Sequence, residues 1–100
     1  MARVRSYTQY VVTGANRGIG LEFVKQLAED GKHIIATARD PDGASELQAI
    51  AAVSEQRVRI MQLDIADAAS VDAFVEEIAN LDIDALINNA GIYPRSGSLG

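Results

Sequence analysis

Short β-rich segments alternate with helical patterns along this 100-residue chain, and the alternation restricts its fold more than any other feature. The segment "HIIATA", residues 33–38, is apolar on both faces, as strands buried inside a parallel sheet are. Helices that connect parallel strands form right-handed crossovers. We therefore expect a single α/β domain over residues 1–100, with an irregular tail at 92–100. The four expected strands are residues 7–13, 33–38, 57–64 and 83–89.

Three helices are expected between these strands. The first runs over residues 19–29 and ends at Gly31, because glycine readily adopts the left-handed conformation that stops a helix. Asp40 and Asp67 are expected to cap the second and third helices, with Pro41 in the first position of the second. In a doubly wound sheet these connections give the strand order 3-2-1-4. The expected core-facing residues are Leu21, Val24, Leu27, Ala28, Leu47, Ile50, Ala51, Val71, Phe74, Val75 and Ile78.

Charge and composition exclude several classes of protein. The chain carries 9 basic and 14 acidic residues, and its net charge of −5 repels nucleic-acid backbones and anionic membrane surfaces. No apolar run approaches the roughly 20 residues that span a bilayer, and no apolar signal segment follows the basic N-terminus. With no cysteine and one histidine, disulfides are excluded and a zinc site is disfavoured. We expect a cytoplasmic protein with no metal and no nucleic-acid or membrane partner.

The stretch "TGANRGIG", from Thr13 to Gly20, places three glycines directly after the first expected strand. Glycine accepts positive φ and lets a ligand approach the backbone, and the free N–H groups of a following helix attract anions. In the expected strand order this turn meets "NNAG", residues 88–91, at the switch point where doubly wound folds bind ligands. The turn is therefore a candidate diphosphate site. A tight turn with glycines for steric reasons only is the alternative.

Three motifs together resemble the short-chain dehydrogenase/reductase family. The spacing T-G-x-x-x-G-x-G at Gly14, Gly18 and Gly20 is similar to the family's cofactor turn. "NNAG" is similar to its fourth-strand motif, and Asp64 to the acidic residue it places at the adenine. The resemblance implies a Rossmann-like doubly wound fold and hydride transfer between a nicotinamide cofactor and a carbonyl substrate. The segment "TGANRGIGLEFVKQL" is similar in particular to the branch of C-factor-like proteins and small carbonyl reductases.

The resemblance also implies roles at the diphosphate. The glycines at positions 14, 18 and 20 would surround it, and Gly20 would allow the helix to pack closely on the strand. Asn16 and Ile19 would offer backbone groups to the phosphates and the ribose.

Further roles concern the adenosine half of the cofactor. Asp64 would accept a hydrogen bond from the adenine amino group, with the backbone of Ile65 beside it. Asn88 would brace the sheet, while Ala90 and Gly91 would leave room for the adenosine ribose. Taken alone, Asp64 is a plain carboxylate at a strand end and Asn88 a polar turn residue. The agreement of three motifs favours the functional interpretation.

Charges near the end of the second expected strand indicate NADP rather than NAD. Family members that choose NAD carry an acid there, which bonds to the ribose 2′-hydroxyl and repels a 2′-phosphate. Here Ala38 occupies that position and Arg39 follows, while Arg17 in the glycine turn can reach the same phosphate. Taken singly, each arginine is an ordinary surface charge. Asp40 opposes the NADP interpretation, because a one-residue shift of the strand would bring its carboxylate nearer the ribose.

The family's catalytic Tyr-x-x-x-Lys pair does not occur in this sequence. The resemblance places that pair and the catalytic serine beyond the fourth strand, so we expect a fold truncated there and a chain that is inactive alone. The fourth strand would then present an apolar edge with unpaired backbone groups, which predicts self-association. We expect the NADP(H)-binding part of a short-chain oxidoreductase that reduces a carbonyl substrate. A nucleotide-binding half-domain without catalysis, or a regulatory relative, is the alternative.

Overall fold

The computed structural model describes residues 8–88, so the predictions for Ala90, Gly91 and the tail at 92–100 lie outside the described residues. Strands and helices alternate along this part of the chain, as predicted. A short 3₁₀ helix, η1 (Pro41–Gly43), adds one element that was not expected. The other elements are β1 (Gln9–Thr13), α1 (Gly18–Glu29), β2 (His33–Ala38), α2 (Ser45–Ala52), β3 (Val58–Gln62), α3 (Ala68–Ile78) and β4 (Ala85–Asn88).

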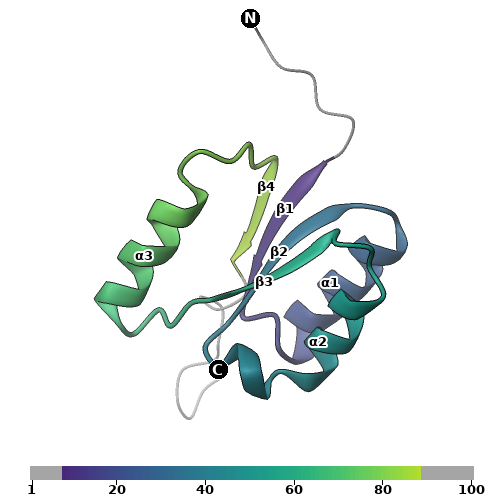
Figure 1. Cartoon of the computed structure of the whole chain (residues 1–100), viewed down its shortest axis with the longest axis horizontal. Coiled ribbons are helices and arrows are strands. Elements are labelled where there is room, and N and C mark those ends of the chain that lie inside the picture. The colour runs from purple at the N-terminus through teal and green to yellow at the C-terminus, as the bar shows by residue number, and fades with distance from the viewer. Residues whose placement is uncertain (1–7, 89–100) are drawn as a thin grey trace, which may run out of the picture.

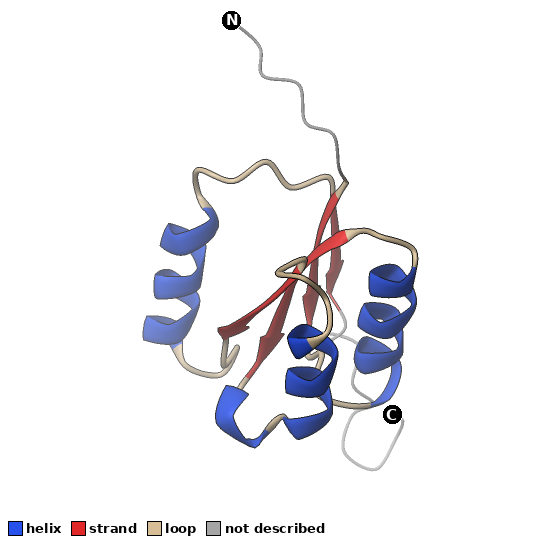
Figure 2. Cartoon of the chain, turned by 45° about the vertical axis from the view of Figure 1, so that its right-hand side comes forward, coloured by secondary structure: helices blue, strands red, loops and turns tan. Residues whose placement is uncertain are grey.

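The described strands form one parallel sheet in the order β3-β2-β1-β4, which confirms the predicted topology. Helices α1 and α2 cover one face of this sheet and α3 covers the other, so the domain has three layers (Figure 1; Figure 2). The chain winds from β1 through β2 to β3 and then returns to place β4 on the other side of β1. The carboxyl end of β1 is therefore the point where the winding reverses.

Two clusters of apolar side chains, one on each face of the sheet, hold the layers together. Along β2, Ile34 packs into the cluster with α1 and α2, and Ile35 into the cluster with α3. Both side chains are buried, as predicted for a strand with helices on both of its faces. The predictions confirmed in the first cluster are Leu21, Val24, Leu27, Ala28, Leu47, Ile50 and Ala51.

Helix α3 confirms its predicted cap and corrects one of its predicted core residues. The Asp67 side chain accepts a hydrogen bond from the Ala69 N–H at 3.0 Å, as an N-cap does. Phe74 and Ile78 pack in the second cluster. Val75, also expected in the core, is 54% exposed. It lies at the margin of the apolar stripe of α3, where no described element covers it.

The start of the second helix differs from the prediction. Asp40 makes no side-chain cap bond, and the turn that follows it is the 3₁₀ helix η1. The α-helix begins only at Ser45, because the buried Ala44 has φ −91° and ψ 68° and interrupts the helical path. The Gln48 side chain bridges the two segments by donating to the Pro41 carbonyl at 2.6 Å. Asp and Pro favour the start of both helix types, so the sequence alone does not distinguish them.

Candidate functional site

A cleft of about 710 Å³ lies where the carboxyl ends of β1, β2 and β3 meet. Its walls come from the residues that follow these strands, such as Gly14 after β1 and Arg39 after β2. The predicted site residues that line it are Gly14, Asn16, Arg17, Arg39, Asp64 and Ile65. The cleft is also lined by residues that the sequence analysis did not place in the site, namely Thr37, Asp40, Gly43, Leu63 and Ala66.

The glycine turn depends on two residues in the left-handed conformation. Gly14 has φ +60° and Gly18 has φ +61°, a backbone region that costs other residues roughly 1–2 kcal/mol. Between them, Ala15 is buried and its N–H donates to the Thr37 carbonyl at 2.8 Å. This bond fastens the turn to β2, and it therefore places Arg17 on the same cleft as Arg39.

The glycine turn leads directly into the N-terminus of α1. Arg17 is the N-cap residue and its side chain makes no cap bond. The first backbone bond of the helix runs from the Leu21 N–H to the Arg17 carbonyl at 3.2 Å. The N–H groups of Gly18, Ile19 and Gly20 come before this first bond and therefore have no acceptor within the helix. Such N–H groups, together with the helix dipole, attract an anion. These three predicted residues adjoin the cleft without lining it.

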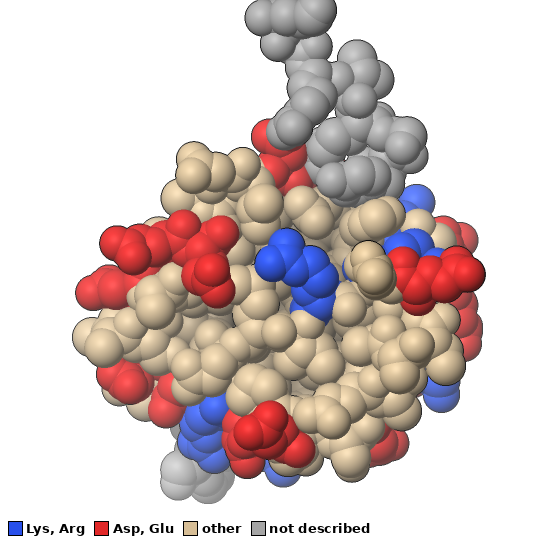
Figure 3. All heavy atoms as spheres, in the orientation of Figure 1, with Lys and Arg blue, Asp and Glu red and all other residues tan. Residues whose placement is uncertain are grey.

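Two guanidinium groups provide the positive charge of the cleft. The side chains of Arg17 and Arg39 are exposed, and neither forms an ion pair within 4.0 Å of a carboxylate in the described part of the chain. The backbone of Arg39 is braced because the Gln62 side chain donates to its carbonyl at 3.4 Å. Acidic side chains are widespread on the face of the domain drawn in Figure 3. Two guanidiniums that have no carboxylate partner among the described residues make this cleft a suitable place for a phosphate group.

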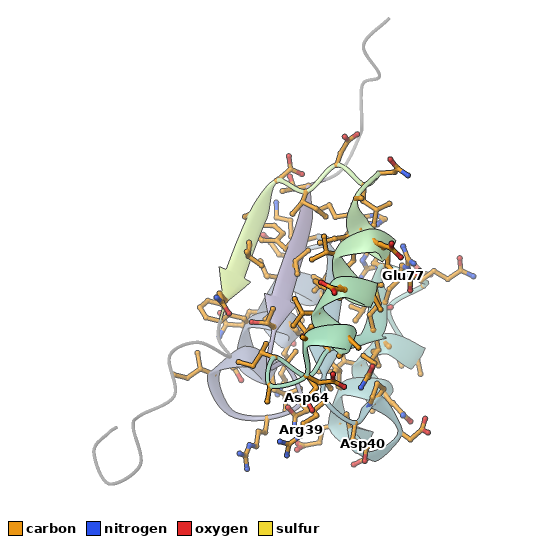
Figure 4. All side chains as sticks on the ribbon, turned by 90° about the vertical axis from the view of Figure 1, so that its left-hand side faces the viewer. Arg39, Asp40, Asp64 and Glu77 are labelled. Carbon is orange, nitrogen blue, oxygen red and sulfur yellow. The ribbon has the colours of Figure 1, made fainter. Side chains whose placement is uncertain are left out.

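Asp64 also lines the cleft, and hydrogen bonds hold the loop that carries it. One of its carboxylate oxygens, Oδ1, accepts from the Ala66 N–H at 3.0 Å. Its backbone N–H donates to the Ser70 hydroxyl at 2.9 Å, and its carbonyl accepts from the Asp67 N–H at 3.0 Å. The other oxygen, Oδ2, has no bond to a described residue and can accept one from a ligand. Figure 4 shows Asp64 with Arg39 and Asp40 at the same end of the sheet.

Ser70 supports this loop, and sequence reasoning missed it. The residue is buried in the first turn of α3, and its hydroxyl holds the Asp64 backbone. A serine six positions after a candidate acid follows no known motif, so no signal in the sequence identified it. Asn88, which was predicted to brace the sheet, lies outside the cleft lining. Its Oδ1 accepts from the Thr13 hydroxyl at 3.0 Å and so links the ends of β1 and β4.

The fold and the site together define a class of protein. A doubly wound parallel sheet with a glycine turn at its first crossover, a helix N-terminus beside it and a cleft at the strand ends is a Rossmann-like domain of the kind that binds dinucleotides. Residues 8–99 match the family model for short chain dehydrogenase, and the chain belongs to this family.

Known proteins of this family are similar over most of the chain. The (+)-neomenthol dehydrogenase of Arabidopsis thaliana is 42% identical over 88 residues, which are 82% of this chain and 30% of that protein. The solved menthone neomenthol reductase of Mentha piperita is 38% identical with a TM-score of 0.75 over 90% of this chain and 33% of its own. A carbonyl reductase of Pseudomonas aeruginosa, solved in complex with NADP, is 32% identical with a TM-score of 0.78 over 89% of this chain and 40% of its own.

This chain thus spans about a third of the length of the relatives named above. Within the part of the chain that the structure describes, no helix has the length and apolar character needed to cross a membrane.

Proposed function

We propose that this chain binds NADP(H) and forms the cofactor-binding part of a short-chain oxidoreductase that reduces a carbonyl substrate. The observation that carries the proposal is the pair of guanidiniums, Arg17 and Arg39, on a cleft that begins at the glycine turn. Neither forms an ion pair with a carboxylate among residues 8–88. A 2′-phosphate has the charge that these groups require. Ala38, the last residue of β2, occupies the position where NAD-selective members of the family carry an acid, so no carboxylate at that position repels a 2′-phosphate.

Each wall of the cleft fits one part of the cofactor. The N–H groups at the start of α1 would hold the diphosphate, and the free Oδ2 of Asp64 would accept from the adenine amino group. Ile65, which is exposed on the same wall, would pack against the adenine and present its backbone to it. When bound, NADPH supplies the hydride for the reduction. The NADP complex of the Pseudomonas aeruginosa carbonyl reductase supports this choice of cofactor.

A second candidate is a nucleotide-binding module that has no catalysis of its own. It is favoured by the lining of the described cleft, whose predicted site residues all have a proposed role in holding a cofactor. For the chain by itself we expect no oxidation of NADPH above the blank with a panel of aldehydes and ketones. Turnover in that assay would exclude the second candidate.

Calorimetric titration of the chain with NADP and with NAD, at low salt, tests the proposed function. We expect NADP to bind more tightly than NAD, because only NADP carries the phosphate that the two guanidiniums can hold. Binding that is equal for the two cofactors, or weaker for NADP, would contradict the assignment of the arginines. Absence of binding by both would overturn the cofactor site itself.

Replacing Asp64 should weaken the binding of both cofactors equally, because NADP and NAD share the adenine that this carboxylate would contact. For Asp64→Asn we expect a loss of about 10- to 100-fold in affinity for each cofactor, because a hydrogen bond to a charged group contributes about that much. The ratio of the two affinities should stay constant. Asp72→Asn, an exposed position on α3 away from the cleft, removes the same charge as a control. A change confined to NADP would place Asp64 at the 2′-phosphate instead.

We also propose that β4 pairs with its copy in a second chain. On one side β4 is bonded to β1, and no other described strand pairs with it. Its Leu86 side chain is 62% exposed, so the edge is apolar as well as unpaired. Antiparallel pairing sets the acidic end of one β4, at Asp82 and Asp84, against the Asn88 end of the other. This arrangement keeps like charges of the two copies apart.

Leu86→Lys should then weaken dimerisation about tenfold or more, since it removes a leucine that the interface would bury and adds a charge there. Sedimentation equilibrium gives the dissociation constants. Val53→Lys, at an 80% exposed position after α2, should leave the constant unchanged. A monomeric wild-type chain at high concentration, or equal effects of the two substitutions, would count against the β4 interface.

A further inference from the structure

Thr37 carries a buried hydroxyl that has no hydrogen-bond partner among the described residues. The residue is the last but one of β2 and is 1% exposed. Its carbonyl accepts from the Ala15 N–H at 2.8 Å, but its Oγ1 meets no donor or acceptor in the described part of the chain. Leaving a buried hydroxyl unpaired is costly, and most such groups are paired in native proteins. This hydroxyl is therefore a candidate for contact with a ligand.

The face of the sheet on which Thr37 lies brings it to the side of the cleft that Leu63 and Asp64 line. Side chains alternate along a strand, so Thr37 shares the face of Ile35, which packs in the cluster with α3. Leu63 belongs to the same cluster, and its N–H donates to the Ala38 carbonyl at 3.0 Å. Thr37, Leu63 and Asp64 all line the cleft. Thr37 is therefore on the side of the cleft to which the proposed function assigns the adenine.

We propose that the Thr37 hydroxyl donates a hydrogen bond to a ring nitrogen of the adenine, which makes Thr37 a further binding residue for the base. The inference rests on the proposed function, because it concerns the same cofactor. A threonine hydroxyl donates one bond, and the ring nitrogens of adenine accept. Asp64 would accept from the amino group, so the two side chains together match both kinds of polar group on this base. Binding would then remove the cost of the unpaired hydroxyl and add to the affinity.

Thr37→Val keeps the shape of the side chain and removes the hydroxyl, so it should stabilise the free chain. An unpaired buried hydroxyl disfavours the folded state, and we expect the equilibrium constant for unfolding to fall about 5- to 100-fold. Thr13→Val is the matched control, because Thr13 is 5% exposed and its hydroxyl donates to Asn88 Oδ1 at 3.0 Å. Removing this existing bond should destabilise the chain. Urea denaturation measures both effects.

The same Thr37→Val variant should bind NADP and NAD more weakly, by about three- to tenfold for each, because both contain the adenine that the hydroxyl would contact. Thr37→Ser keeps the hydroxyl and should stay within about twofold of the wild-type affinity. Calorimetry with both cofactors gives these values. A threonine with a purely structural role would not make the valine variant more stable and at the same time weaker in binding.

If Thr37→Val destabilises the chain as Thr13→Val does, the hydroxyl has a partner within the protein and the inference is wrong. Unchanged affinity for both cofactors would also overturn it, and a loss confined to one cofactor would place the hydroxyl at the ribose instead of the base. In each of these cases the binding of NADP by the wild-type chain leaves the proposed function intact. If the wild-type chain binds neither cofactor, the proposed function fails, and the ligand assigned to Thr37 fails with it.

Discussion

Arg39→Gln is expected to reduce the affinity for NADP by about 10- to 100-fold, the usual worth of a charge-assisted hydrogen bond to a phosphate. The affinity for NAD should change by less than about threefold, because NAD has no group for this guanidinium to hold. Combining Arg39→Gln with Arg17→Gln should abolish the preference for NADP altogether. Calorimetry with both cofactors at low salt measures these differences directly.

Arg59→Gln is the control for this series. Arg59 is exposed on β3, outside the cleft lining, and its replacement changes the net charge by the same amount. It should therefore alter both affinities only slightly. If Arg59→Gln lowers NADP affinity as much as Arg39→Gln does, the preference arises from the overall charge of the chain, and the local contact is refuted.

Gly18→Ala is expected to lower the affinity for NADP and for NAD equally, by about tenfold or more. Gly18 has φ +61°, and a β-carbon there would meet no protein atom within 4 Å. The cost has two parts. Alanine strains the backbone that presents the first N–H groups of α1, and its methyl group enters the open space where a diphosphate would approach. Because the diphosphate is common to both cofactors, the ratio of their affinities should be unchanged.

Gly31→Ala is the control that distinguishes backbone strain from the loss of contacts with the diphosphate. Gly31 ends α1 with φ +79°, and its β-carbon would also meet nothing within 4 Å. Both variants should therefore lose a similar free energy of unfolding, about 1–2 kcal/mol by urea denaturation. Only Gly18→Ala should lose cofactor affinity. Equal cofactor binding by the two variants would mean that the glycine turn does not contact the diphosphate.

The fold was predictable because each level of the sequence indicated the same structure. Strand β2 has the predicted bounds, His33 to Ala38, and Arg39 therefore directly follows the strand and lines the cleft. The order of the strands followed from the alternation of strand and helix together with the handedness of crossovers. The family assignment followed from three motifs on the expected elements. Membership of the C-factor-like branch and a cytoplasmic location stay predictions.

The details that could not be predicted depend on tertiary contacts. The second α-helix begins at Ser45 and not at Pro41, because the conformation of Ala44 separates η1 from α2. Val75 matches the helical period but lies at the edge of the stripe that α3 presents to the sheet. Ser70 reaches the Asp64 backbone only because β3 and α3 meet at that loop. The roles of the cleft residues in binding a cofactor are likewise predictions that only a ligand can test.

A crystal structure of the chain with NADP would show directly whether the cleft holds the cofactor. We expect the diphosphate at the N–H groups of Gly18 to Gly20, the adenine beside Asp64, and the 2′-phosphate between the guanidiniums of Arg17 and Arg39. A nucleotide bound elsewhere, or a cleft that stays empty at saturating NADP, would contradict this expectation.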